Sequence, residues 1–236
     1  MYYWNQKNFK GLKDIGEKYC NIYGYEAFAN YCFLKEKGLK KEALQAVNAF
    51  VLSTKCKSIE EQRKIANEII SLSYHNRDIH QLISHPLMQF LLGVFKNWAG
   101  EVSEDATPYR WLGYISNDLV YYEKALEINP TDEISIIMLA KASLNCIAYQ
   151  THHLSETRFI GKPDDARYSL EKADKLINRL SQGEVKVRLL EEYHYYLNLV
   201  NRWTEYNQEQ HTLSFPEWCE AKGVHFNFLS IIYYNK

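Results

Sequence analysis

The residues best suited to chemistry lie in one short stretch, THHLSETRFIGKP, residues 151 to 163. Two adjacent imidazoles, His152 and His153, precede the carboxylate of Glu156 and the guanidinium of Arg158. Imidazole and carboxylate groups bind a metal ion or transfer protons when three or more of them converge on one point. One hypothesis is therefore a metal-assisted hydrolase that uses His152, His153 and Glu156.

The spacing of these residues favours a structural role. Neighbouring histidines point in different directions on a helix, and the offset to Glu156 matches no known metal-binding pattern. Gly161 suits a left-handed turn, and Pro163 suits the first position of a new helix. We therefore predict a helix end, a bend and a second helix, with no catalytic residue, no metal and no cofactor. The two histidines, the glutamate and the arginine named above remain candidates for binding.

Other motifs of catalysis are missing from the sequence. It has no Gly-x-Ser-x-Gly, no phosphate-binding glycine loop, no dinucleotide fingerprint and no His-Glu-x-x-His. His75, His80 and His85 are spaced by five, which separates them by about 140° on a helix, so they do not share a face. Cys219 and His225 could be drawn as a thiol and its base, but an inert buried cysteine is the more common case. We predict that the protein is not an enzyme.

The composition limits which classes of partner and which cellular compartment are expected. The 236 residues include 28 Lys and Arg and 29 Asp and Glu, giving a net charge of -1. Such a chain has no overall field to attract nucleic acid or an anionic membrane, so neither is expected as a partner. Its 5 cysteines form no Cys-x-x-Cys pair, and no apolar run has the length of a signal peptide core or a membrane span. We expect a cytoplasmic protein with reduced thiols.

The elements around the bend are predicted to be helical. Residues 26 to 55 have the pattern of a helical hairpin turned at Gly38. Three stretches have the Ser-x-x-Glu form of a capping box and so predict helix starts: 58 to 61, 181 to 184 and 214 to 217. The run LMQFLLGVFKNW, 87 to 98, is apolar on most sides and predicts a buried helix. The tail VHFNFLSIIYY is expected to pack on the last helices or on a partner.

A polar stretch, AGEVSEDATP at 99 to 108, is the best candidate for a linker. It would separate an N-terminal helical subdomain, 1–99, from a C-terminal helical subdomain, 100–236. One continuous domain is the alternative, because a polar turn between two packed helices has a similar composition.

A helix-turn-helix pattern follows this stretch. In YYEKALEINPTDEISIIMLA, Tyr122 and Ala125 share one face of a helix that must stop before Pro130. The phrase resembles the tetratricopeptide repeat, and weaker copies of the spacing occur at Ala43, Val47 and Phe50 and at Ala166, Leu170 and Ala173. Segment 151 to 163 is also similar to part of uncharacterised bacterial repeat-like proteins. The resemblance implies an all-α fold, either an irregular tetratricopeptide-like solenoid of helical hairpins or a compact bundle.

Stacked helical hairpins usually bind a peptide, a helix or another protein on one face, so the resemblance implies a non-catalytic protein–protein interaction module. The chain has 19 tyrosines, a residue type suited to contact surfaces. To the four candidates in the bend, the aromatic-rich helices add Trp111, Tyr114, Tyr121, Tyr195, Tyr196 and Trp203. A narrower form of the hypothesis is a bacterial immunity-type protein that neutralises a toxin by binding it. An adaptor or a chaperone for a peptide or helix is the other form.

Overall fold

The structure, a computed structural model, describes residues 6–210 and 212–228. Within these residues the chain is all-α, with eleven α-helices and no strand, which confirms the predicted fold class. None of the described helices combines the length and the apolar character that crossing a membrane requires. The chain forms two compact units that divide between Tyr121 and Tyr122, and each is described by itself.

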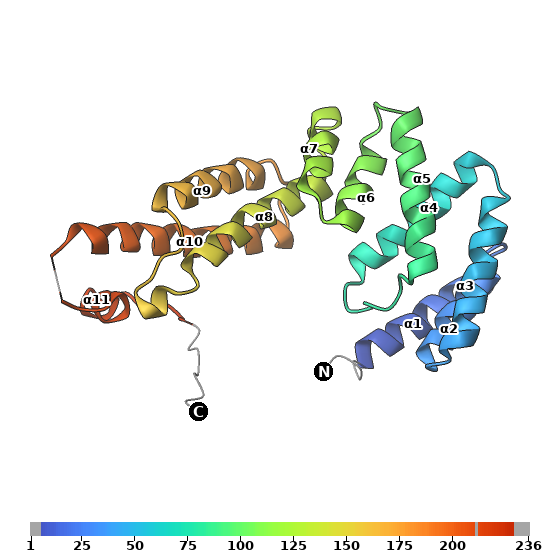
Figure 1. Ribbon diagram of the computed structural model, residues 1–236, viewed down its shortest axis with the longest axis horizontal. Helices are drawn as coiled ribbons and strands as arrows, with labels where there is room; N and C mark the ends of the chain where they lie inside the picture. Colours follow the sequence, from blue (N-terminus) through green and yellow to red (C-terminus); the bar gives the residue numbers. More distant parts are fainter. Residues whose placement is uncertain (1–5, 211, 229–236) are drawn as a thin grey trace. The chain divides into compact units, whose positions relative to one another are not determined.

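Unit 1 is built from helical hairpins (Figure 1). Its helices are α1 (Gln6–Tyr19), α2 (Glu26–Glu36), α3 (Lys40–Lys55), α4 (Ile59–His75), α5 (His85–Glu101) and α6 (Ala106–Ser116). The closest packing joins α1 to α2 and α2 to α3. The turn between α2 and α3 lies at Gly38, as the sequence predicted, and Gly38 has the left-handed conformation, with φ +74°.

A carboxylate clamped by two phenols ties three segments of unit 1 together. Tyr19 Oη donates to Glu68 Oε1 at 2.7 Å, and Tyr25 Oη donates to Glu68 Oε2 at 2.6 Å. Burial, and then the hydrogen bond to Glu68, raises the pKa of both tyrosines well above the usual value. We call this group, Tyr19, Tyr25 and Glu68, the tyrosine clamp. It joins the end of α1 and the start of α2 to α4.

Two of the three predicted capping boxes are present. Ser58 with Glu61 caps α4, and Ser214 with Glu217 caps α11 (Phe215–Ala221). The third prediction is wrong, because α10 (Glu184–Gln208) starts after Gly183 without a side-chain cap. Ser181 Oγ donates instead to Glu133 Oε1 at 2.9 Å, a partner that is distant in sequence.

Unit 2 is a second helical stack (Figure 1). It contains α8 (Glu133–Thr151), the short 3-10 helix η2 (Leu154–Glu156), α9 (Pro163–Ile177), α10 and α11, and α7 (Leu119–Ile128) crosses the division between the units. Helices α8 and α9 form a closely packed hairpin, and α10 packs against both.

The positions that suggested a repeat are packing positions. Tyr122 and Ala125 of α7 are fully buried, and so are Ala166 and Ala173 of α9. The small side chains of the three alanines let neighbouring helices approach closely, and the Tyr122 ring fills the space beside them. Membership of the tetratricopeptide-repeat family stays a prediction.

The division of the chain differs from the expected boundary at residues 99 and 100. Both residues lie inside α5, and residues 102–105 form a short turn between α5 and α6, which pack on each other within unit 1. Asp105 caps α6 by accepting a hydrogen bond from the Thr107 N–H at 2.8 Å. The polar character of this stretch therefore reflects a capped turn.

Candidate functional site

The predicted bend is present between α8 and α9. Helix α8 ends at Thr151, Gly161 has φ +84° and α9 begins at Pro163, as the sequence predicted. Thr157 also adopts the left-handed conformation, with φ +58°. This conformation is strained for a β-branched residue, so the contacts around Thr157 must hold it in place.

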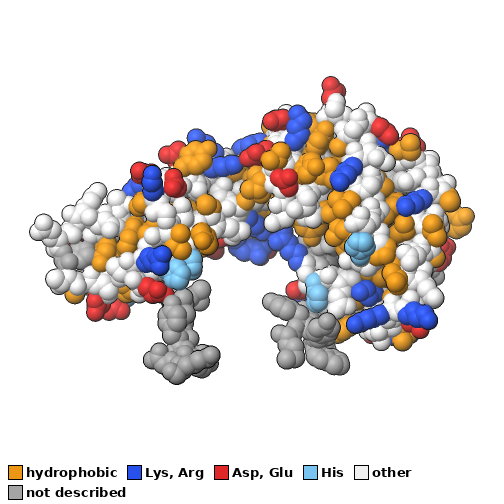
Figure 2. Space-filling model, in the orientation of Figure 1, with side chains coloured by type: hydrophobic (Ala, Val, Ile, Leu, Met, Phe, Trp, Pro, Cys, Tyr) orange, Lys and Arg blue, Asp and Glu red, His pale blue; other side chains and the backbone are white. Residues whose placement is uncertain are grey.

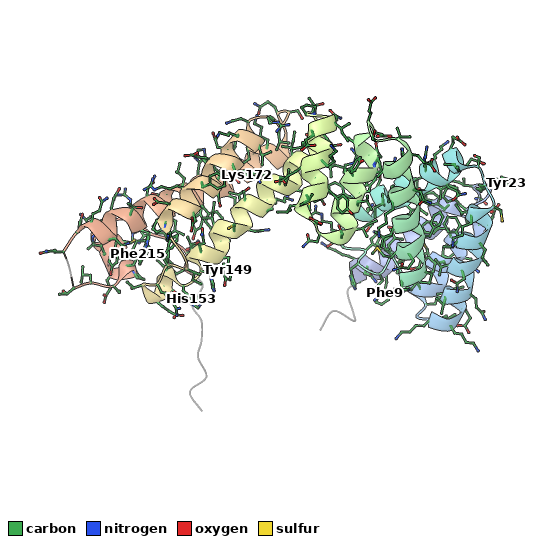
Figure 3. All side chains as sticks on the ribbon, turned by 45° about the horizontal axis from the view of Figure 1, so that its top comes forward. Phe9, Tyr23, Tyr149, His153, Lys172 and Phe215 are labelled. Atoms are coloured by element: carbon green, nitrogen blue, oxygen red, sulfur yellow. The ribbon has the colours of Figure 1, made fainter. Side chains whose placement is uncertain are left out.

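The two histidines of the bend bond to local partners. His152 is exposed, and its Nδ1 lies 2.6 Å from the carbonyl oxygen of Tyr149. His153 Nδ1 lies 3.1 Å from Glu156 Oε1, and the His153 side chain is 26% exposed. In the described part of the chain, no group of three or more His, Cys, Asp or Glu residues could hold a metal ion. Figure 3 shows Tyr149 and His153 near one another at the end of α8.

An apolar cluster packs α11 against the bend. Leu154 is fully buried, and the ring of Phe159 stacks on Trp203 with centroids 5.9 Å apart. The Phe215 N–H donates to Thr157 Oγ1 at 2.9 Å, which fixes the strained residue to the start of α11. The bend therefore serves as the docking surface for the last helix of unit 2. We call Leu154, Phe159, Trp203 and Phe215 the bend cluster.

The apolar tail was expected to pack on the last helices or on a partner. Val224, Phe226 and Phe228 pack against the bend cluster, which agrees with the first of these expectations. The remaining part of the tail, 229–236, lies outside the described residues. The Cys219 thiol beside the cluster has its pKa raised to about 11 by burial, despite the opposing effect of Arg202. A protonated thiol of this kind is a poor nucleophile.

The aromatic candidates in unit 1 are only partly accessible. Trp111 is 1% exposed, and its Nε1 donates to Asn67 Oδ1 at 2.6 Å, so it is a core residue and not the surface contact that was expected. Tyr114 is half-buried, with its ring edge-on to Tyr74 at 5.6 Å. Tyr121 is also half-buried. Aromatic type alone did not separate the packed side of α6 from its open side.

In unit 2, the expected binding residues divide in the same way. Trp203 is buried in the bend cluster and so is not available to a partner, while Tyr196 is half-buried against it. Tyr195 and Arg158 are exposed. Figure 2 shows hydrophobic side chains scattered in small groups among charged ones on the visible face. Tyr149, 64% exposed, is an open aromatic residue that the sequence analysis did not select.

Unit 1 also has a groove that was not predicted from the sequence. It lies between α4 and α5 beside the end of α3, and it has a volume of about 310 Å³. Figure 1 shows α4 and α5 next to each other. Phe90 and Val94 of α5 line its floor, and Ile59, which is 52% exposed, lines one side. Apolar side chains beside polar ones, with open access, are typical of a surface that binds a partner.

Local contacts hold the walls of the groove. The Arg63 guanidinium lies over the Trp98 ring at 5.4 Å from its centroid and pairs with Glu101. Gln62 Nε2 donates to the carbonyl oxygens of Lys55, at 3.3 Å, and Lys57, at 2.9 Å, which fixes the end of α3 to α4. The groove is therefore formed before any partner arrives.

Gly93 opens the middle of the groove. It lies inside α5 and is exposed, and a Cβ added there would meet no atom within 4 Å. Gln89 and Asn97, one turn before and one turn after Gly93, are exposed on the same face. Their carboxamides make no hydrogen bond to another described residue. The spacing Gln-x3-Gly-x3-Asn inside an apolar run was the signal in the sequence, and it shows that α5 has one open side.

No protein-family model matches the chain, and comparisons with curated proteins and with solved structures found no match. Two surfaces with definite geometry therefore remain as candidate functional sites. They are the bend of unit 2, which is occupied by α11, and the groove of unit 1, which is open.

Proposed function

We propose that the protein is a non-catalytic helical scaffold that binds a segment of another protein in the groove of unit 1. The observation that carries the proposal is Gly93. A glycine inside a helix costs about 0.5–1 kcal/mol relative to alanine. The space beside it is empty, so packing gives no reason for the missing side chain. Close approach of a partner to the backbone of α5 gives one, because Gly93 lines the groove, whereas Gly100, which has the same open space, does not.

The chemistry of the groove suits a protein ligand. Its floor is apolar, its Trp98 side chain is of a type that contributes strongly to interfaces, and the carboxamides of Gln89 and Asn97 can each donate and accept hydrogen bonds. Because Gln62, Arg63 and Trp98 are already held by local contacts, binding has to order chiefly Lys55, Gln89 and Asn97, which limits the entropic cost.

The bend gives the competing hydrolase hypothesis no comparable support. His152 and His153 each bond to a neighbour, and the underside of the bend is packed against α11. Immunity-type, adaptor and chaperone roles would all use a groove that binds protein segments. The identity of the partner separates these roles.

Selection from a library of random 12-residue peptides, displayed on their own mRNA, tests the proposal with the full chain as bait. Selected peptides are then measured against Gly93→Trp, which fills the groove. Gly100→Trp is the matched control, because Gly100 is also exposed in α5 with no atom within 4 Å of an added Cβ, but it does not line the groove.

We expect Gly93→Trp to weaken the selected peptides at least about tenfold, a loss of roughly 1.4 kcal/mol, with little change in Gly100→Trp. Circular dichroism would check that both variants keep their helices. Peptides that bind all three proteins equally, or a selection that yields no binders, would refute the proposal.

A further inference from the structure

We infer that the groove holds an extended segment whose backbone bonds to Gln89 and Asn97, and which carries a carboxylate that pairs with Lys55. The inference rests on the proposed function and names the conformation and charge of the occupant. It uses three observations: the spacing of the two carboxamides, the bare backbone at Gly93 between them, and the charges in the lining.

The spacing of the carboxamides matches an extended chain. Gln89 and Asn97 are eight residues apart on α5, which is about 12 Å along the helix axis. Four residues of an extended strand cover about 13 Å, and residues four apart point to the same side. Each carboxamide can bond to both the N–H and the C=O of one residue. A helical occupant would offer few such groups, because its backbone bonds are satisfied internally.

Gly93 lies midway between the two carboxamides. In an extended occupant, the N–H and C=O of the residue midway between the two bonded ones point to the same edge, toward the bare backbone at Gly93, and its side chain stands roughly perpendicular to that edge. The missing Cβ lets the backbone of the occupant approach α5 closely there. The groove therefore accepts an extended segment whose hydrogen-bonding edge faces α5.

The charges of the lining favour an acidic group. Lys55, Arg63 and Glu101 are the charged residues that line the groove. Arg63 is neutralised by Glu101, whereas Lys55 has no ion-pair partner among the residues that the structure describes. The remaining charge is one exposed ammonium, and a carboxylate of the bound segment complements it.

The experiment takes the peptides from the selection and methylates their backbone nitrogens one at a time. We expect two sensitive positions four residues apart, each losing at least about tenfold in affinity. The loss at one position should disappear in Gln89→Ala and the loss at the other in Asn97→Ala, because each variant has already lost the bond. Both substituted residues are exposed, and a thermal melt confirms that the variants are folded.

The charge is tested with a second pair of changes. Replacing the acidic residue of the peptide by its amide should weaken binding to the wild-type chain and to the control Lys96→Met, but not to Lys55→Met. Lys96 is an exposed lysine of α5 that does not line the groove.

The outcomes separate the two claims. Peptides that depend on Gly93 but show no pair of sensitive positions, or that bind more tightly when helix-favouring residues are introduced, would overturn this inference and leave the proposed function standing. Peptides that tolerate loss of the acid on the wild-type chain would overturn its charge component. A selection without Gly93-dependent binders would overturn both claims.

Discussion

Removing one hydroxyl from the tyrosine clamp is expected to destabilise unit 1. In Tyr25→Phe, Glu68 loses a 2.6 Å hydrogen bond and keeps the bond from Tyr19. Hydrogen bonds to charged groups contribute about 1.5–3 kcal/mol. Tyr25 is 8% exposed while Glu68 is half-buried, so water can reach the carboxylate in part. We therefore expect a loss near the lower end, about 1.5–2 kcal/mol.

The double variant Tyr19→Phe/Tyr25→Phe leaves the carboxylate without either phenol. Either single variant leaves the carboxylate with one phenol, whereas the double variant leaves it with neither. The loss of stability in the double variant should therefore exceed the sum of the losses in the two single variants. Tyr23→Phe is the matched control, since Tyr23 is 92% exposed and lies only two residues from Tyr25. Its effect should remain within about 0.5 kcal/mol.

Amide hydrogen exchange of α1, α2 and α4 measures these losses in unit 1 alone, and urea unfolding followed by circular dichroism gives the stability of the whole chain. This separation matters because a chain with two compact units can unfold in more than one step. If the amides of α1, α2 and α4 exchange at equal rates in Tyr25→Phe and Tyr23→Phe, the clamp does not stabilise unit 1 and the reasoning fails.

Four further predictions concern both units. The pKa of each clamp tyrosine is raised in the folded chain, so the unfolded chain loses these protons at a lower pH. Unit 1 should therefore keep its stability up to about pH 10 and lose it as the pH rises further, with a smaller loss per pH unit in Tyr25→Phe. A urea midpoint that does not change above about pH 10 would contradict this. Gly93→Ala should raise the stability of unit 1 by about 0.5–1 kcal/mol in urea unfolding, and a decrease would show that the space beside Gly93 is not open. Leu154→Ala should destabilise unit 2 by about 2–5 kcal/mol, seen as faster exchange in α8 and α11, because the residue is fully buried in the bend cluster. Thr157→Asn should match or exceed the wild-type thermal midpoint, since asparagine tolerates the left-handed conformation and keeps an acceptor for the Phe215 N–H. Thr157→Val should lower the midpoint, because valine has no acceptor. The reverse order would show that this bond does not fix the bend.

The sequence predicted those features that depend on neighbouring residues. The caps at Ser58 and Ser214, the left-handed Gly161 and the start of α9 at Pro163 all follow from short-range backbone geometry. Ser181 shows the limit of this reasoning, because Glu133, which is brought close by the fold, takes the hydroxyl that would have capped α10.

The candidate site could not be predicted in the same way. Trp111 and Trp203 have the residue type of a binding surface, but the helices packed around them make them core residues. The spacing of Gln89, Gly93 and Asn97 marks the open side of α5, but the groove itself exists because α3 and α4 leave that side uncovered. The walls of the groove therefore depend on the arrangement of three helices, which no local pattern gives.

The hydrogen bond from Phe215 to Thr157 joins residues that are 58 positions apart, and this separation affects how unit 2 forms on the ribosome. The bend leaves the exit tunnel before α10 and α11, so Leu154 and Phe159 have no cover while those helices are being synthesised. Unit 1 can bury its core during the same interval. A nascent chain stalled before residue 215 would therefore carry a finished first unit and a second unit with exposed aromatic rings, which is the species that a chaperone would hold.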